Sequence, residues 1–298
     1  MRAYVIGNVT VDETISVSAM PEAGASILGR EETRDLGGKG ANQAVVMGRA
    51  GLAVTLVAAV GEDFRAETIR SQLAEEPVEA RLIQLAGKAS DFSIIFTTPD
   101  GENAIVTTTD SAGSLTLAEA VTPLAESIPG DLLVLQGNLT DEVTRGILEE
   151  ARHRQLLTAF NPSPLRPFFT GLWPLIDIAF LNKGEAESLT GAAGQAAASA
   201  LISAGVKHVV LTLGGEGAML ASESGALTIP ATPASVIDTT GAGDTFMGVT
   251  LASAALRGVP LDARAVRHAT AAAALTVSRR GTRSAFPTKA ELHSILAG

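Results

Sequence analysis

The stretch Asp238-Thr-Thr-Gly-Ala-Gly-Asp244 runs directly into an apolar, Ala-rich segment at 245–256 that contains no proline. Because two glycines allow a sharp turn, we expect a helix to begin here with its free N–H groups facing outward. Such a helix start attracts anions. The carboxylate of Asp244 would repel an anion, which makes sense if it accepts a proton from an attacking hydroxyl. The alternative is an acid that only stabilises the first helical turn.

Composition limits the classes of function. The chain has 298 residues, 46% of them apolar and 4% aromatic, which suits one large α/β domain or two small ones. A net charge of −10 argues against nucleic acid or an anionic membrane as a partner. The absence of cysteine excludes disulfides and thiolate catalysis. No apolar run approaches the roughly 20 residues that span a bilayer, and no signal-peptide pattern is present, so we expect a cytoplasmic protein.

Strand and helix patterns alternate along most of the chain, which predicts a mostly parallel central sheet with helices on both faces. The short apolar runs that suggest buried strands are 3–7, 54–60, 131–136, 156–160, 176–181 and 209–213. The predicted helices are 40–50, 64–75, 117–127, 141–154, 192–204, 243–257, 261–278 and 289–297. Ligands of such α/β proteins bind at the carboxyl ends of the strands.

Four further segments have the alternation of strands with one wet face. They lie at 11–19, near 25–35, at 91–98 and at 103–109, the last two joined by a turn at 99–102. We expect them to form a small antiparallel sheet, a lid inserted at about 11–36 and 89–110 into a single domain of residues 1–298.

A glycine-rich segment, Asp35-Leu-Gly-Gly-Lys-Gly-Ala-Asn-Gln43, precedes the first predicted helix. Its glycines let the main chain approach a ligand, while Lys39 and Asn42 offer hydrogen-bond donors. It is not a Walker A loop, because Gly40 follows Lys39. A glycine-rich hinge with a solvated lysine is the alternative.

Two other strand ends carry polar or flexible residues. Asn182-Lys-Gly-Glu185 suits a hydrated magnesium ion, although its spacing favours a helix cap with Asn182 as N-cap and Glu185 at the third position. The turn at 212–217 is able either to cradle a nucleotide or simply to connect two strands.

Together these motifs resemble the ribokinase-like carbohydrate kinase family, also called the ribokinase/phosphofructokinase-B superfamily. GGKGANQA at 37–44 and DTTGAGDTF at 238–246 are close to that family's two signatures. Gly7-Asn-Val-Thr-Val-Asp12 resembles its sugar-contacting start. Asn161-Pro-Ser-Pro164, Asn182-x-x-Glu185 and the 212–217 turn follow in the family's order, so the resemblance extends over nearly the whole chain.

The resemblance implies a role for each motif. Asp244 is the expected general base, and the N–H groups of Gly241, Ala242 and Gly243 are the expected anion hole for the transferring phosphoryl group. The residues expected to bind the sugar are Thr10, Asp12, Gly38, Lys39, Asn42, Asn138 and Asp244. Those expected to bind ATP are Asn182, Thr212, Gly214, Gly215, Gly217, Gly243 and Thr270.

The resemblance also implies metal ions and a partner. Glu185, with Asn182, is expected to organise Mg²⁺. Main-chain oxygens of Asp238, of Thr240 and of the 276–281 segment, which includes Gly281, are the expected ligands of an activating K⁺ ion. Lids of this family often pair, and apolar residues on one face of the lid strands need a cover, so we expect a homodimer formed through the lid.

Several positions depart from the ribokinase pattern. Thr10 replaces an Asn, Gln136-Gly-Asn138 replaces Gln-Leu-Glu, and Ser111-Ala-Gly113 replaces Gly-Ala-Asn. Thr270 replaces the adenine-side Asn, and Ala285 a Ser of the cation loop. We therefore expect an ATP-dependent kinase that phosphorylates a primary alcohol, with a pentose, a fructose-like ketose or a nucleoside as acceptor. A phosphosugar kinase, or a sugar- or nucleotide-sensing protein without catalysis, is the alternative.

Overall fold

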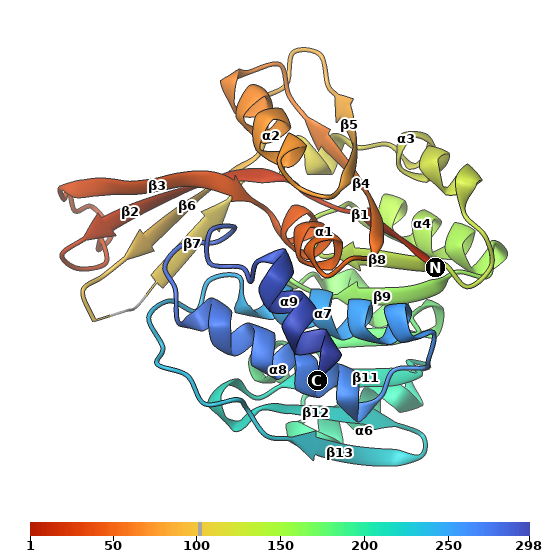
Figure 1. Cartoon of the computed structure of the whole chain (residues 1–298). Coiled ribbons are helices and arrows are strands. Elements are labelled where there is room, and N and C mark those ends of the chain that lie inside the picture. The colour runs from red at the N-terminus through yellow and green to blue at the C-terminus, as the bar shows by residue number, and fades with distance from the viewer. Residues whose placement is uncertain (101–102) are drawn as a thin grey trace.

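The computed structural model describes residues 1–100 and 103–298, so the predicted turn at 99–102 falls partly outside it. Its largest feature is a sheet that has nine strands within the described residues (Figure 1). In spatial order they are β13 (Gly225–Ile229), β12 (Ala218–Ser222), β11 (His208–Thr212), β10 (Ile178–Asn182), β9 (Leu157–Asn161), β8 (Leu132–Gln136), β1 (Arg2–Ile6), β4 (Ala53–Val60) and β5 (Glu79–Gln84). All pairings from β11 to β5 are parallel, whereas β12 and β13 add an antiparallel hairpin. The predicted, mostly parallel sheet is confirmed.

Helices cover both faces of this sheet, as predicted. They are α1 (Lys39–Arg49), α2 (Phe64–Ala74), α3 (Leu117–Val121), α4 (Asp141–His153), α5 (Lys183–Thr190), α6 (Gly194–Ser203), α7 (Ala242–Arg257), α8 (Ala263–Val277) and α9 (Lys289–Ala297). The predicted helix at 117–127 changes to a 3₁₀ turn at Thr122, because Pro123 provides no N–H for a further α-helical bond. No described helix is both long and apolar enough to cross a membrane.

The sheet separates two hydrophobic cores. Successive side chains of β1 point to opposite faces, so Val5 lies in one core and Ile6 in the other. Helices α1, α2, α7, α8 and α9 close the first core, while α3, α4, α5 and α6 close the second. Figure 1 shows α7, α8 and α9 together in front of the sheet. Both faces are therefore buried, which explains the continuous apolar runs of the central strands.

A second sheet projects from one side of the molecule and corresponds to the predicted lid (Figure 1). Its strands, in order, are β3 (Gly29–Gly37), β2 (Thr10–Val17), β6 (Phe92–Thr97) and β7 (Asn103–Thr107). The β2–β3 and β6–β7 pairs are antiparallel as expected, but the central β2–β6 pair is parallel. The chain reaches β6 only after passing through the main sheet, and such a long crossover permits a parallel pairing.

Parallel strands bring polar residues together at one rim of the main sheet. Gln136 at the end of β8 lies in register with Asn161 at the end of β9. Asn182 at the end of β10 is likewise in register with Thr212 of β11. The carboxyl ends of these four strands thus place amide and hydroxyl groups side by side, where α/β proteins bind ligands.

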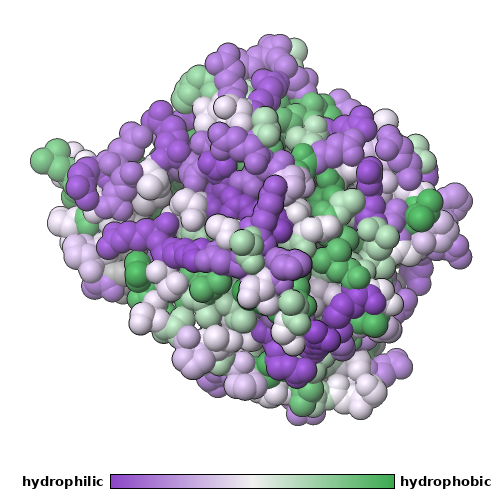
Figure 2. Space-filling view, in the orientation of Figure 1, coloured by the Kyte–Doolittle hydropathy of each residue, from purple (hydrophilic) through white to green (hydrophobic). Residues whose placement is uncertain are grey.

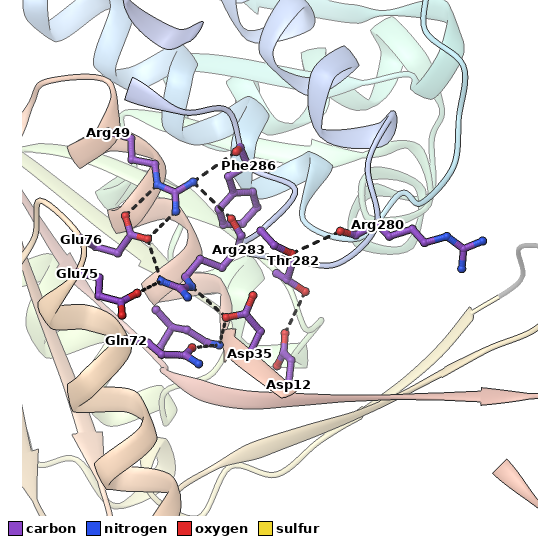
Figure 3. A network of polar contacts seen from close by, with 12 residues as sticks. Asp12, Asp35, Arg49, Gln72, Glu75, Glu76, Arg280, Thr282, Arg283 and Phe286 are labelled. Carbon is purple, nitrogen blue, oxygen red and sulfur yellow. Dashed lines mark hydrogen bonds and ion pairs between the residues drawn. The ribbon is translucent and has the colours of Figure 1, made fainter. Parts of the chain in front are cut away.

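A cluster of charged side chains fastens the base of the lid to the segment between α8 and α9 (Figure 3). Arg283 donates to Asp35 of β3 at 2.9 Å and to Glu76, just after α2, at 3.2 Å. Arg49 of α1 donates to Glu76 at 2.8 Å and to the carbonyl oxygen of Phe286 at 3.3 Å. The side chain of Glu76 is only 5% exposed. One buried carboxylate therefore holds two guanidinium groups from distant parts of the chain.

Burial alone would raise the pKa of Glu76, but the guanidinium groups of Arg49 and Arg283 outweigh it and lower that pKa below its usual value. The carboxylate is consequently ionised at neutral pH and stabilises the folded state. A group with a lowered folded pKa contributes stability above its unfolded pKa, about 4.3 for glutamate, and loses it as the pH falls through the folded pKa.

We predict that Glu76→Gln lowers the free energy of unfolding at pH 7 by about 3–5 kcal/mol, because the largely buried Arg49 loses its one carboxylate partner among the described residues and Arg283 keeps only Asp35 and Glu75. The difference from wild type should narrow as the pH falls from 7 toward 3 in urea denaturation. Glu75→Gln is the matched control. Its side chain is 66% exposed, so its removal should cost at most about 1 kcal/mol. If Glu76→Gln changed the free energy of unfolding only slightly, or by the same amount at every pH, this account would be contradicted.

Candidate active site

The turn before α7 has the geometry that its glycines predict. Gly241 caps the helix with a φ of +73°, and a Cβ there would lie 2.6 Å from the ring of Phe286. The N–H of Thr240 donates to one oxygen of Asp238 at 2.9 Å, and the N–H of Gly281 donates to the other at 3.1 Å. The predicted helix start is confirmed, and Asp238 ties it to the segment after α8.

Asp244 lies in the first turn of α7 and is buried, with 6% of its surface exposed. Asn42 donates to its Oδ2 at 2.9 Å, and Gln43 donates to its Oδ1 at 3.0 Å. Both donors come from α1, which starts directly after Gly38. The φ of +89° at Gly38, and the 2.9 Å that would separate a Cβ from Val9, restrict that position to glycine.

Gln43 and Gln136 are site residues that sequence reasoning missed. Gln136 Nε2 donates to Gln43 Oε1 at 2.7 Å, and Gln43 in turn donates to Asp244. Gln43 stands inside the GGKGANQA motif, so its place in that motif was the one available signal. Nothing in the spacing of Gln136 indicates that its side chain reaches α1.

Asp12 of β2 forms a second buried carboxylate near Asp244. It accepts hydrogen bonds from Thr10 at 2.7 Å and from Thr282 at 3.5 Å. Burial raises the pKa of Asp12 above its usual value, against the hydrogen bonds from Thr10 and Ser93, and the negative charge of Asp244 adds to the effect of burial. A Cβ at Gly37 would lie 2.0 Å from the carboxyl carbon of Asp12, so this glycine makes room for the acid.

Asn138 is buried just beyond the end of β8, and its Oδ1 meets no donor among the described residues. An unpaired buried acceptor costs roughly 1–3 kcal/mol. A bound ligand that donates a hydroxyl would remove this cost. The position expected to bind the sugar therefore has a free acceptor.

A pocket of about 600 Å³ opens beside the start of α7. Six of the seven residues predicted to bind ATP line it: Thr212, Gly214, Gly215, Gly217, Gly243 and Thr270. The remaining described residues of its wall include Ala231, Pro233, Val236 and Ala273, and none of the lining side chains carries a charge. Such a wall suits an uncharged, flat group such as a nucleobase. Thr270 already donates to the carbonyl of Arg267 at 2.9 Å.

A smaller pocket of about 90 Å³ adjoins the large one through Thr212, Gly243 and Phe246, which line both. Lys39, Asn161, Asn182, Glu185 and Asp244 also line it. Two of the predicted sugar residues, Lys39 and Asp244, therefore meet predicted nucleotide residues here. The other predicted sugar residues, Thr10, Asp12, Gly38, Asn42 and Asn138, do not line this pocket. Asp244 lies where the predicted sugar and nucleotide residues meet, with the N-terminus of α7 on the same side.

Asn182 and Glu185 form the helix cap that their spacing predicts. Asn182 Oδ1 accepts from the N–H of Glu185 at 2.8 Å, and Glu185 Oε2 accepts from the N–H of Asn182 at 2.9 Å. Both side chains also line the smaller pocket, so the cap does not exclude a role toward a ligand. Within the described residues there is no cluster of three or more His, Asp or Glu side chains able to enclose a metal ion. A hydrated Mg²⁺, which needs only one or two protein ligands besides phosphate oxygens, fits this donor set.

The predicted cation segment adjoins the same turn. The N–H groups of Ile237 and Asp238 both donate to the carbonyl of Val277, at 2.7 and 3.2 Å. The carboxylate of Asp238 is occupied by the N–H groups of Thr240 and Gly281. The two segments that are expected to supply main-chain oxygens to a cation are thus in direct contact.

Comparisons with known proteins agree with this arrangement. Residues 5–289 match the model of the pfkB family carbohydrate kinase. The ribokinase of Haemophilus influenzae is 30% identical over 294 residues, which cover 96% of this chain and 95% of that protein. The crystal structure of a ribokinase from Thermotoga maritima gives a TM-score of 0.88 at 26% identity and covers 100% of both chains. A ribokinase from Cryptococcus neoformans var. grubii in complex with ADP gives 0.83 at 26% identity, covering 98% of this chain and 99% of that one. The chain belongs to the pfkB family of carbohydrate kinases.

Proposed function

We propose that this carbohydrate kinase transfers the γ-phosphoryl group of ATP to the primary alcohol of a sugar, with Asp244 as general base. The observation that carries the proposal is the position of Asp244, buried in the first turn of α7 at the wall of the smaller pocket and next to Gly243, which lines both pockets. Relatives named ribokinase, one of them in complex with ADP, support a sugar and an adenine nucleotide as the two substrates.

The proposed reaction uses groups on both sides of Asp244. The acceptor oxygen forms a bond to the γ-phosphorus while its proton moves to Asp244, and the bond from that phosphorus to the β–γ bridging oxygen breaks to release ADP. The N–H groups of Gly241, Ala242 and Gly243, at the positive end of α7, stabilise the charge on the transferring group. Lys39, which lines the smaller pocket, adds a positive charge near the reacting atoms.

Magnesium has a proposed place at Asn182 and Glu185. When bound, Mg²⁺ neutralises charge on the β- and γ-phosphates. Glu185 would hold the hydrated ion through its carboxylate, which the capping box keeps in one orientation at the wall of the smaller pocket. The large uncharged pocket then receives the adenine and ribose of ATP.

The sugar is proposed to bind between the base of the lid and α1. Asp12 and Asn42 offer acceptor and donor groups, while Asn138 offers its free Oδ1. The amide at 138 stands where ribokinases tend to have a carboxylate. An acceptor sugar therefore needs a hydroxyl directed at Asn138, and we favour a pentose because the relatives reported above are ribokinases.

The test begins with coupled ATP-consumption assays over pentoses, ketoses and nucleosides, with and without K⁺. On the best acceptor, we expect Asp244→Asn to lower kcat by about 10²–10⁴-fold, the range for loss of a general base. Asp141→Asn is the matched control, since Asp141 is also an acid in the first turn of a helix but is half-exposed. It should leave kcat unchanged.

Near wild-type turnover in the Asp244→Asn variant would refute the mechanism. ATP consumption that stays at background with every acceptor would favour the non-catalytic sensor. If only nucleosides were phosphorylated, the protein would be a nucleoside kinase instead of a sugar kinase.

We further propose that the protein acts in the cytoplasm, that K⁺ bound near Asp238, Thr240 and Gly281 activates it, and that two lids pair into a homodimer.

Exposed apolar residues support the pairing of two lids. Val106 on the edge strand β7 is 62% exposed, and Leu28 in the β2–β3 connection is 94% exposed. Figure 2 shows hydrophobic residues at the outer tip of the lid.

We therefore predict a solution mass of twice 30.4 kDa at micromolar concentration, measured by light scattering. Val106→Lys, which puts a charge on the exposed strand edge, should shift the mass toward the monomer. A monomeric wild type would contradict the pairing.

A further inference from the structure

Two buried glutamines form a chain of hydrogen bonds that ends on Asp244. Gln43 Nε2 donates to Asp244 Oδ1 at 3.0 Å, and Gln136 Nε2 donates to Gln43 Oε1 at 2.7 Å. Both glutamine side chains are completely inaccessible to solvent. The chain joins α7, α1 and the end of β8, three elements that are far apart in the sequence.

A carboxylate at position 244 dictates the orientation of both amides. A carboxylate only accepts hydrogen bonds, so Gln43 must present its NH₂ group to Asp244. The carbonyl of Gln43 then faces Gln136, which must present its own NH₂ group. If Gln43 reversed, its carbonyl oxygen would face Asp244 Oδ1, and only a protonated Asp244 would tolerate that contact.

Gln136 is held in its orientation at a cost. Its Oε1 is buried and meets no donor within the described part of the chain. Gly7 leaves the space that this oxygen occupies, since a Cβ at Gly7 would lie 2.0 Å from it. An unsatisfied buried acceptor next to a site is uncommon in native proteins and calls for an explanation.

We propose that Gln136 and Gln43 are positioning residues that hold the carboxylate of Asp244 ionised and aimed at the acceptor hydroxyl. This inference rests on the proposed role of Asp244 as general base. Gln43 acts on Asp244 directly, whereas Gln136 acts only by fixing the orientation of Gln43. Neither glutamine has solvent-accessible surface, so neither presents an atom to a substrate.

The other charged groups near Asp244 stay unchanged when the glutamines are replaced. Among the described residues, Asp12 faces Asp244 from β2, Lys39 from the start of α1 and Glu185 from α5. The hydrogen-bond partners of Asp12 are Thr10, Ser93 and Thr282, and within the described residues none of them hydrogen-bonds to Gln43 or Gln136. A change in the pH dependence of turnover on replacing a glutamine therefore reports on Asp244.

The test uses three variants, Gln43→Met, Gln136→Leu and the double variant. Methionine keeps the length of glutamine but donates no hydrogen bond to Asp244. Loss of a hydrogen bond to a charged group, worth roughly 1.5–3 kcal/mol, corresponds to about one to two pH units. We expect the acid limb of the kcat–pH profile to move upward by that amount in Gln43→Met, so that kcat begins to fall at a higher pH than in wild type.

Gln136→Leu should move the same limb in the same direction but less, because Gln43 remains and only loses its fixed orientation. Its Tm should stay close to that of wild type, since the variant removes one unpaired acceptor, Gln136 Oε1, and creates another, Gln43 Oε1. The acid limb of the double variant should lie at the same pH as that of Gln43→Met, because Gln136 acts only through Gln43. The KM for ATP should not change in any of them.

The proposal would be overturned if the acid limb of the single variants coincided with that of wild type. It would also be overturned if the shift of the limb in the double variant equalled the sum of the two single shifts. Asp244→Asn, measured in parallel, separates this failure from failure of the proposed function. If Asp244→Asn loses activity while the glutamine variants do not shift the acid limb, Asp244 is still supported as the general base, but the positioning role of the glutamines is refuted. If Asp244→Asn keeps its activity, the proposed base itself is refuted.

Discussion

The buried carboxylate of Asp244 is the constraint on which the arrangement of the site depends. A buried charge must be hydrogen-bonded, and Asn42, which is 202 positions away in the sequence, provides one of its two donors. That contact requires α1 and α7 to pack side by side, with Gly38 and Gly241 turning the chain directly before each helix. The two glycine-rich motifs therefore pack against each other, and they place the Asp244 carboxylate in the first helical turn of α7, where we propose that the phosphoryl group binds.

The segment between α8 and α9 connects the two proposed substrate sides of this site. Thr282 reaches Asp12 on the proposed sugar side, and Phe286 packs against Gly241 on the proposed phosphoryl side. Between them, Arg283 is fixed to Asp35 at the base of the lid. A displacement of this segment would disturb both sides at once, and the buried charge cluster of Figure 3 opposes that displacement.

Local patterns predicted the main sheet, the helices on both of its faces, the lid and the start of α7, because each depends on periodicity or on turn-forming residues. The sequence pattern does not predict β5 and β13 at the two edges of the sheet, nor β12 beside β13, because most of their residues are exposed or only half-buried and burial imposes little pattern on them. The prediction of an entirely antiparallel lid was wrong for β2 and β6, which pair in parallel, because the direction of a pairing depends on the path of the chain between the two strands. The contacts of Gln136 and Arg283 lie between residues more than 90 and 200 positions apart, and only the assembled fold brings them together.

The central claim concerns one distance, between Asp244 and the hydroxyl that is phosphorylated. A crystal structure of the wild-type protein with its acceptor sugar and a non-hydrolysable ATP analogue measures it directly. The account predicts an Asp244 carboxylate oxygen within hydrogen-bond reach, about 2.6–3.2 Å, of the primary hydroxyl. It also predicts that the γ-phosphate lies at the N–H groups of Gly241–Gly243 and the adenine in the pocket lined by Gly214 and Thr270. A hydroxyl that faces away from Asp244, or a nucleotide bound elsewhere, would contradict it.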